Sequence, residues 1–307
     1  MAHSIGRNIT FALTIYRQYT YNDSTMNRLN VQKQAQIVAA LVEGNSIRAT
    51  VRMTGVSKNA IQRLMAKLGP ACEQYQARAL RNLPCKKIQC DEIWSFCYAK
   101  QKNVPAEMQG QFGFGDVWTW TSRCADTKLI VNYKIGTRGA ATAYALMHDL
   151  AGRLSNRIQL TTDGHRVYAD AVESAFGSAI DYAMLVKVYG DDGRDREVRY
   201  SPAEYAGWRA MPISGNPKKR DISTSFVERQ NLTMRMQMRR FTRLTNAFSK
   251  KVENLGWAVA LHFMHYNFCR VHQTLRVTPA MESGVADHIW TLEEVIGLIS
   301  ENVQNAA

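Results

Sequence analysis

The sequence lacks paired cysteines and long apolar segments. Its six cysteines include no pair spaced as CxxC, and several lie among apolar residues, as reduced and buried thiols usually do. The apolar run nearest the start, residues 11–16, is interrupted by Thr14, is far shorter than a membrane span, and is followed by no signal-peptide cleavage region. We therefore expect a cytoplasmic protein that is neither exported nor bound to a membrane.

Acidic residues are scarce relative to basic ones. The 307 residues hold 39 Lys and Arg but 26 Asp and Glu, which gives a formal charge of +13. A charge of this size favours a polyanionic partner such as nucleic acid. The length predicts one large or two to three small domains. Hydrophobic residues make up 46% of the chain, enough to build a core, which excludes a chain that is disordered throughout or built of low-complexity repeats.

Three short helices are predicted near the N-terminus. The first covers residues 31–42, the second ends at Gly55, and the third begins after the N-cap Ser57 and ends at Gly69 and Pro70. A tight glycine turn between the last two helices is typical of a helix-turn-helix. The residues before them, 1–25, show no helical or strand period and are predicted to be a poorly structured extension, with Met26 as an alternative start.

The third of these helices would present short polar and basic side chains to solvent. Side chains of this kind reach base edges and phosphates in the major groove of DNA. We therefore predict an all-α helix-turn-helix domain over residues 26–72. The alternative is a small helical bundle that serves only packing. The predicted DNA-binding residues are Ser57, Lys58, Asn59, Gln62 and Arg63.

After residue 84 the hydrophobic pattern becomes strand-like. An aperiodic segment at residues 190–222 is interpreted as a long loop or insertion. The order β-β-β-α-β-α-β-α predicts an α/β (mixed) fold over residues 84–275, a ribonuclease H-like domain with a five-strand mixed sheet, and residues 276–307 are predicted to form a C-terminal helical tail. The predicted strands are 88–98, 116–124, 129–135, 158–162 and 180–188, and the predicted helices are 140–154, 168–176 and one that starts near Ser225.

Three acidic residues are placed to share one site in such a fold. Asp91 lies in the first strand, Asp163 follows the fourth strand, and Glu228 lies near the start of the last helix. Because the first and fourth strands are neighbours in a ribonuclease H-like sheet, we expect the three carboxylates to converge. Convergent carboxylates bind the pairs of magnesium ions that catalyse phosphoryl transfer on nucleic acids. The sequence therefore predicts a site for two Mg ions, for which Mn can substitute.

The helix that carries Glu228 also carries arginines on the same face. A rotation of 100° per residue puts Arg235 and Arg239 within about 20° of Glu228. It puts Arg243 within about 60° of Glu228. The segment 218–251 has ten Lys or Arg and two acidic residues, a net charge of +8. A metal site beside a DNA backbone requires this combination, so the three arginines are predicted to bind DNA.

Five short runs also carry a resemblance to a known family. They are Cys90-Asp91-Glu92-Ile93-Trp94-Ser95, Thr162-Asp163-Gly164, Gly215-Asn216-Pro217, residues 223–233 (STSFVERQNLT) and residues 246–251 (NAFSKK). Together they resemble the bacterial insertion-sequence transposases of the IS-one type, and the resemblance covers about residues 26–290.

This resemblance implies a bacterial, nucleoid-associated DDE transposase that binds double-stranded DNA at the ends of its own element and at the target. In such an enzyme Asp91, Asp163 and Glu228 hold the catalytic metals, and Arg235 binds the element's end. Cutting and joining two ends implies a homodimer or a higher oligomer. Some relatives carry an N-terminal zinc ribbon, but no cysteine pair precedes Val31 here.

Two alternatives stay open at this stage. One is a catalytically inactive helix-turn-helix regulator or a domesticated remnant of a transposase. The other is a ribonuclease H-like nuclease without strand transfer.

A second cluster of possible metal ligands lies near the C-terminus. His262, His265, Cys269 and His272 are spaced by 3, 4 and 3 residues and would lie on one helical face, as zinc ligands do. We favour packing or DNA contact instead, because residues 266–275 resemble the family's C-terminal helix. Further along, Thr291 and Glu294 are placed to form a capping box.

Overall fold

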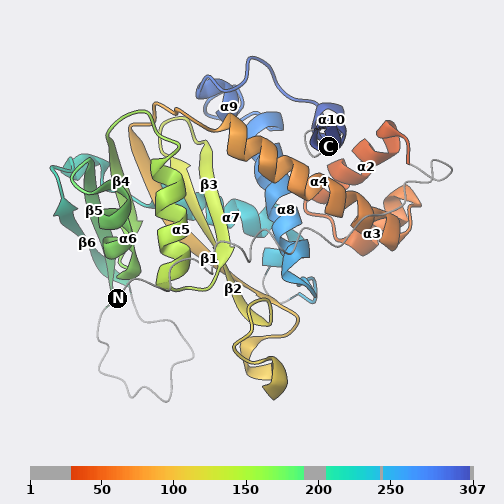
Figure 1. Cartoon of the computed structure of the whole chain (residues 1–307), viewed down its shortest axis with the longest axis horizontal. Helices are drawn as coiled ribbons and strands as arrows, with labels where there is room; N and C mark the ends of the chain where they lie inside the picture. The colour runs from red at the N-terminus through yellow and green to blue at the C-terminus, as the bar shows by residue number, and fades with distance from the viewer. Residues whose placement is uncertain (1–28, 190–204, 243–244, 305–307) are drawn as a thin grey trace.

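The computed structural model describes residues 29–189, 205–242 and 245–304. A mixed sheet forms one half of the molecule and a group of helices forms the other (Figure 1). The predicted N-terminal extension, 1–25, and Arg243 lie outside the described residues. No helix in the described part of the chain is both long enough and apolar enough to span a membrane.

The sheet has the order β3-β2-β1-β4-β5-β6. Strand β1 pairs in parallel with β4, and β4 pairs in parallel with β5, whereas the other three pairings are antiparallel. This topology, with the first and fourth strands adjacent, confirms a mixed α/β fold of the ribonuclease H-like type. The strands are β1 Lys87–Cys97, β2 Gly115–Cys124, β3 Ile130–Gly136, β4 Ile158–Asp163, β5 Ile180–Tyr189 and β6 Tyr205–Ser214.

The prediction of five strands was wrong by one, because residues 205–214 form the edge strand β6 rather than part of a loop. Two features hide this strand from the pattern. Its register against β5 shifts between Tyr182 and Ala183, so side-chain alternation is broken. Pro212 also lies within it, which an edge strand tolerates because one row of its N–H groups has no partner to lose.

Helices α5 Ala140–Ala151 and α6 Val167–Phe176 cover one face of the sheet, and α7 Ser225–Gln237 packs on β1 and β2 from the other. The expectation that α7 continues beyond residue 240 was wrong. It ends at Gln237, and a 3₁₀ turn Arg239–Phe241 follows. Met238 turns into an extended conformation there and is buried, so helical phase no longer relates Arg239 to Glu228.

The N-terminal helices are α2 Val31–Val42, α3 Ile47–Thr54 and α4 Lys58–Ala79. The expected caps are present, since Ser57 Oγ accepts the N–H of Ala60, and Gly55 is left-handed, with φ of 72°. The predicted end of the third helix at Gly69 and Pro70 was wrong, because α4 runs through Pro70 for another nine residues. Burial of the second half of α4 against α8 outweighs the backbone hydrogen bond that the proline removes.

The C-terminal elements return to this helical group. Helix α8 Val252–Met264 packs along α4 and leads into a π-helical turn, His265–Cys269. After α9 Pro279–Glu282, helix α10 Leu292–Gln304 packs on α2 and α4. The predicted capping box is confirmed, because Thr291 Oγ1 accepts the N–H of Glu294 and the Glu294 carboxylate accepts the N–H of Thr291.

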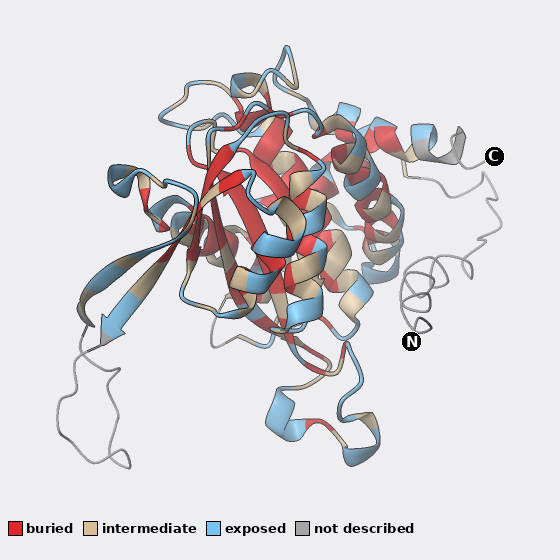
Figure 2. Ribbon diagram, turned by 60° about the vertical axis from the view of Figure 1, so that its left-hand side comes forward, coloured by how far each residue is buried: buried red, intermediate tan, exposed pale blue. Residues whose placement is uncertain are grey.

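The core is continuous between the two halves of the molecule. One cluster of buried apolar side chains extends from Ile37 and Leu68 in the helices to Ile88 and Leu160 in the sheet. Figure 2 shows the central strands buried, whereas the outer part of the β5–β6 ribbon projects away from the body and is exposed. Helix α4 therefore shares one core with the sheet, while its own packing partners are α8, α10 and α3.

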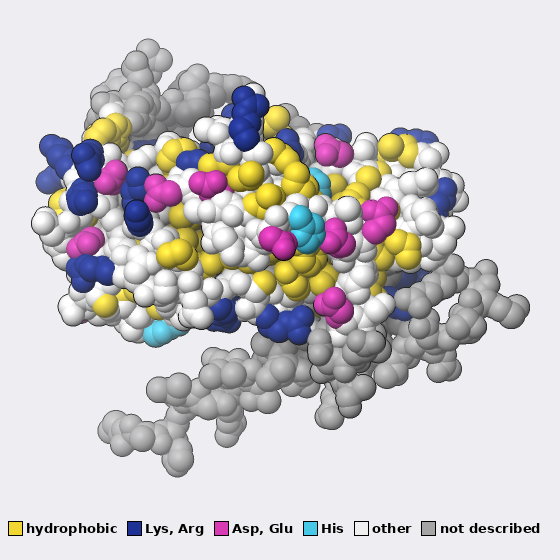
Figure 3. All heavy atoms as spheres, turned by 90° about the horizontal axis from the view of Figure 1, so that it is seen from above, with side chains coloured by type: hydrophobic (Ala, Val, Ile, Leu, Met, Phe, Trp, Pro, Cys, Tyr) yellow, Lys and Arg dark blue, Asp and Glu magenta, His cyan; other side chains and the backbone are white. Residues whose placement is uncertain are grey.

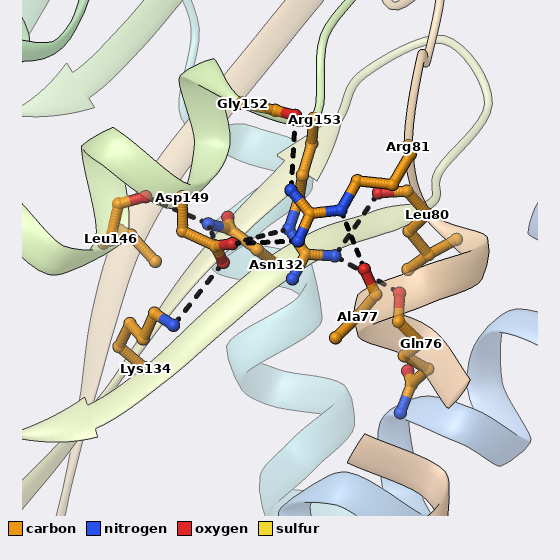
Figure 4. A network of polar contacts seen from close by, with 10 residues as sticks. All are labelled: Gln76, Ala77, Leu80, Arg81, Asn132, Lys134, Leu146, Asp149, Gly152 and Arg153. Atoms are coloured by element: carbon orange, nitrogen blue, oxygen red, sulfur yellow. Dashed lines mark hydrogen bonds and ion pairs between the residues drawn. The ribbon is translucent and has the colours of Figure 1, made fainter. Parts of the chain in front are cut away.

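A polar network reinforces this junction (Figure 4). Asp149 of α5 pairs with Arg153 at 3.1 Å and with Lys134 at 3.5 Å, and it accepts a hydrogen bond from Asn132 at 3.1 Å. The buried Arg153 also donates to the carbonyls of Gln76 and Leu80, at the C-terminal end of α4. The network thus joins α5 and β3 to the end of α4.

We expect Asp149→Ala to destabilise the protein by about 3 kcal/mol, because it leaves the buried Arg153 without its counterion. Urea unfolding measures the change. The control is Glu173→Ala, which removes an exposed carboxylate from α6 and is expected to have little effect. Equal stability of the two variants would contradict the structural role of the network.

Candidate functional site

The register of two parallel strands brings Asp91 and Asp163 together. Cys90 of β1 pairs with Thr162 of β4, so the next residue of each strand occupies a neighbouring position on the same face. One oxygen from each of Asp91, Glu92 and Asp163 lies within 4.8 Å of the other two. The two predicted aspartates therefore share one site at the centre of the sheet.

Helix α7 is attached to the same strand. Asn231 Nδ2 donates to Asp91 Oδ2 at 2.8 Å. Gln89, two residues before Asp91 on the same face of β1, accepts the N–H groups of Phe226 and Val227 with its Oε1, at 2.9 and 3.1 Å. These contacts hold the first turns of α7, which include Glu228, over the face of the sheet that carries Asp91.

The carboxylate of Glu228 is not part of the three-carboxylate group. It pairs with Lys187 Nζ of β5 at 2.9 Å and accepts a hydrogen bond from Thr224 Oγ1 at 2.9 Å. Both partners of the ion pair are partly exposed, with 44% of the Lys187 side chain and 40% of the Glu228 side chain accessible. An ion pair this exposed contributes little free energy, so the Glu228 side chain can exchange partners at low cost.

Glu92 is an acidic neighbour that the sequence analysis did not single out. It is buried, and its Oε1 accepts a hydrogen bond from Arg138 Nε at 2.8 Å while its Oε2 accepts one from the Tyr168 hydroxyl at 3.1 Å. Strand alternation places Glu92 on the opposite face from Asp91, so no sequence pattern indicates that the two carboxylates approach each other.

Two other residues at the site, Gln89 and Asn231, were also missed, although periodicity could have found them. Asn231 lies one helical turn after Glu228, and Gln89 lies two strand positions before Asp91.

The electrostatics of the group favour a bound cation. Burial, and then the negative charges of Asp163 and Glu92, raise the pKa of Asp91 to about 7, with a weaker contribution from Glu228. Burial and Asp163 also raise the pKa of Glu92, whereas Arg138 opposes that shift. Carboxylate oxygens are the ligands that Mg and Mn prefer, so the donor set fits a divalent cation at Asp91 and Asp163.

The residues predicted to bind DNA through the helix-turn-helix lie at the surface. Ser57, Lys58, Asn59 and Arg63 are exposed on the first turns of α4, and Gln62 is half-buried. Arg63 Nε donates to the Asn59 carbonyl at 3.4 Å. In the view of Figure 3, Lys and Arg side chains are interspersed with acidic and apolar ones, so the excess positive charge does not form one continuous patch on that face.

The predicted arginines after Glu228 differ in position. Arg235 is half-buried in the last turn of α7, and Arg239 is exposed in the following 3₁₀ turn. They lie in different elements, so the common helical face predicted for them was wrong beyond Gln237.

The four possible zinc ligands near the C-terminus do not lie on one helical face. The π-helical turn changes the spacing between His265 and Cys269, and His272 follows the end of the helix. Within the described part of the chain, the ligand atoms of these four side chains do not converge on one point as those of Asp91, Glu92 and Asp163 do. His262 is fully buried, and neither of its ring nitrogens has a hydrogen-bond partner within the described residues.

Comparisons with known proteins add structural neighbours only. No protein-family model and no curated protein matches the sequence. Among solved structures, the piggyBac transposase in a synaptic complex with hairpin DNA is 9% identical, with 96% of this chain and 77% of that chain covered and a TM-score of 0.39.

Two Mos1 transposase structures are also similar. The paired-end complex with the left transposon end is 15% identical, with 53% of this chain and 63% of that chain covered and a TM-score of 0.20. The strand transfer complex is 12% identical, with 83% and 81% covered and a TM-score of 0.23. Because these identities and TM-scores are low, we base the functional proposal on the geometry of the site.

His262 gives the protein a specific dependence of stability on pH. Burial lowers the pKa of His262 to about 3, with smaller effects of His265 and Arg270. The unfolded chain takes up this proton below the ordinary pKa of about 6.5, whereas the folded protein does not take it up until the pH approaches 3. The stability that the neutral imidazole contributes is therefore complete above about pH 6.5 and is lost as the pH falls toward 3.

We expect His262→Leu to lose about 2 kcal/mol less stability than the wild type between pH 7 and pH 5, because the variant has no proton to take up at this position. Urea unfolding at the two pH values measures the difference. His148→Leu removes an exposed imidazole and serves as the control. Equal pH dependence of His262→Leu and the wild type would contradict the low pKa.

Proposed function

We propose that this protein is a DDE transposase that cleaves DNA strands at the ends of a mobile element and joins them to a target. The observation that carries the proposal is the convergence of Asp91 and Asp163 on adjacent parallel strands, with Glu228 delivered by a helix that is hydrogen-bonded to Asp91. Two convergent aspartates, with a third acid on a helix attached to the same strand, supply the carboxylates that metal-dependent phosphoryl transfer requires.

Glu228 is a better third ligand than Glu92. Both carboxylate oxygens of Glu92 are already engaged, one by Arg138 and the other by Tyr168. Glu228 is held by the half-exposed Lys187, and its side chain lies one helical turn from Asn231, which contacts Asp91. Asp91, Asp163 and Glu228 would therefore hold two Mg or Mn ions, with Glu92 and Arg138 supporting the site from the other face of the sheet.

The divalent ions would supply activation of the attacking water or 3′-hydroxyl and stabilisation of the leaving oxygen. The protein's own residues define where this happens. The two aspartates fix the position in the sheet, and Gln89 and Asn231 orient α7. Arg235, in the last turn of α7, would contact the DNA backbone.

Recognition of the element's end is assigned to the exposed turn of α4 that begins at Ser57. Double-stranded DNA, at element ends and at the target, is the proposed partner, and a homodimer or higher oligomer is the proposed working form. One site cannot hold two ends at the same time.

The first test is Asp163→Asn on duplexes that span the DNA flanking this gene. We expect the wild type to nick and join these duplexes in the presence of Mg, and the variant to lose both activities, because one ligand charge is removed. DNA binding, measured by fluorescence anisotropy, should stay within about two-fold of the wild type, because the exposed turn of α4 is unchanged. Specific binding without strand cleavage by the wild type would favour a regulator or an inactive remnant, and cleavage without joining would favour a nuclease.

The second test addresses recognition. Arg63→Ala is expected to weaken binding of the flanking duplexes by about 5- to 100-fold at fixed salt, because it removes a contact from the recognition helix. The control Lys102→Ala removes one positive charge from an exposed turn between β1 and β2. The same dissociation constant for Arg63→Ala and Lys102→Ala would count against the assignment of α4.

A further inference from the structure

A pocket of about 260 Å³ lies directly beside Glu228. Leu185 and Lys187 of β5 and Trp208 of β6 line one side, and residues 222–225, which lead into α7, line the other. The volume is slightly below the roughly 300–1,000 Å³ of pockets for drug-sized ligands. The pocket is therefore too small for duplex DNA, and its size is nearer to that of a single nucleotide.

One side of this pocket is an aromatic surface. Lys187 and Trp208 are direct partners in the β5–β6 pairing, so both side chains leave the same face of the sheet. Trp208, in the edge strand β6, is 57% exposed. A large indole with this exposure at the rim of a pocket offers a flat surface for stacking, and nucleobases stack on aromatic side chains of this kind.

Besides Trp208, Leu185 and Ile222, the pocket is lined by hydroxyl groups and by side chains of both charges. Lys187 Nζ lies 2.9 Å from Glu228 Oε1, and the hydroxyls of Ser223 and Ser225 are 2.9 Å apart on the other side. An ammonium group is a partner for phosphate, and hydroxyls are partners for the sugar and phosphate oxygens of a nucleic acid. An aromatic plane, a cation and two hydroxyls in one small pocket match the base, phosphate and sugar of one nucleotide.

We propose that this pocket binds one unpaired nucleotide of the DNA strand next to the cleaved phosphate, with its base against Trp208 and its phosphate at Lys187. This inference rests on the proposed function and extends it. The phosphate would replace Glu228 as the partner of Lys187, which would release the Glu228 carboxylate toward Asp91 and Asp163. Lys187 would in this way couple entry of a distorted strand to assembly of the three carboxylates.

The test compares two 30-base-pair duplexes of the same sequence. One is fully paired, and the other has a central bubble of three unpaired nucleotides that contains the fluorescent base 2-aminopurine. In EDTA, where strand cleavage does not occur, we expect the wild type to bind the bubble duplex about 5- to 100-fold more tightly than the paired one, the range for stacking of one base on an aromatic side chain. Stacking should also quench the 2-aminopurine.

Trp208→Ala should lose the preference and the quenching while it keeps the affinity for paired DNA. Trp208→Phe should keep part of both, because a ring remains. The control is Phe112→Ala, which removes another exposed aromatic side chain from the connection between β1 and β2, outside the pocket. It should behave as the wild type does, and the urea midpoints of all variants establish that they are folded.

A preference retained by Trp208→Ala, or an equal loss of affinity for both duplexes, would overturn the inference. The result is independent of catalysis, because Asp163→Asn should show the same preference as the wild type. A preference that depends on Trp208 in a protein that does not cleave would refute the proposed function and leave the pocket assignment intact. Cleavage by a wild type that shows no preference for the bubble duplex would overturn the pocket assignment and leave the proposed function intact.

Discussion

The attachment of helix α7 to strand β1 is the interaction on which the candidate site depends. The first N–H groups of a helix have no partner within it, and the N-cap residue of α7, Thr224, does not cap them because its hydroxyl bonds to Glu228 instead. Gln89, buried in the middle of the sheet, accepts two of these N–H groups. The buried Arg123 of β2 donates to the carbonyl of Phe226 in the same turn. The position of Glu228 is therefore set by side chains of two strands.

Basic side chains explain why the carboxylates can be assembled at all. Burial raises the pKa of Asp91, and the negative charges of Asp163 and Glu92 raise it further, so the ionised acids are costly to hold together. The fold neutralises two of them with side chains, since Arg138 pairs with Glu92 and Lys187 pairs with Glu228. Within the described residues, the hydrogen-bond donors to Asp91 are neutral: the amide of Asn231 and the N–H of Glu92. Its remaining negative charge is compensated most directly by a cation, which is the physical basis for placing a metal there.

Much of this arrangement could be predicted from local pattern. The hydrophobic alternation of residues 88–98 and 158–162 gave the two central strands, and their neighbourhood in the sheet predicted the meeting of Asp91 and Asp163. The parts that failed depend on long-range packing. Pro70 is tolerated within α4 because α8 covers that helix, and β6 is held by its pairing with β5 despite Pro212. No periodicity in the sequence contains that information.

The contact between Glu228 and Lys187 was beyond prediction for a related reason. Lys187 lies in β5, a strand that the alternation of residues 180–188 predicts correctly. Its ion-pair partner, however, depends on which helix lies over that strand. Glu92 shows the same effect. Alternation assigns it to the other face of β1, yet one of its carboxylate oxygens lies near those of Asp91 and Asp163. Sequence patterns predict where helices and strands lie, whereas side-chain contacts between these elements depend on tertiary packing that no local pattern encodes.

Helix α4 links the two halves of the proposed activity. Its first turns carry Lys58 and Arg63, and its last turns bind Arg153, which belongs to the network around Asp149. Its 22 residues span about 33 Å at 1.5 Å per residue, and its middle packs against α8. A continuous packed helix, unlike a flexible linker, keeps its two ends at a constant distance and orientation. In the proposed function, the distance between the recognised DNA and the carboxylates is therefore set by a rigid element of fixed length, which makes the site of cleavage a consequence of the fold.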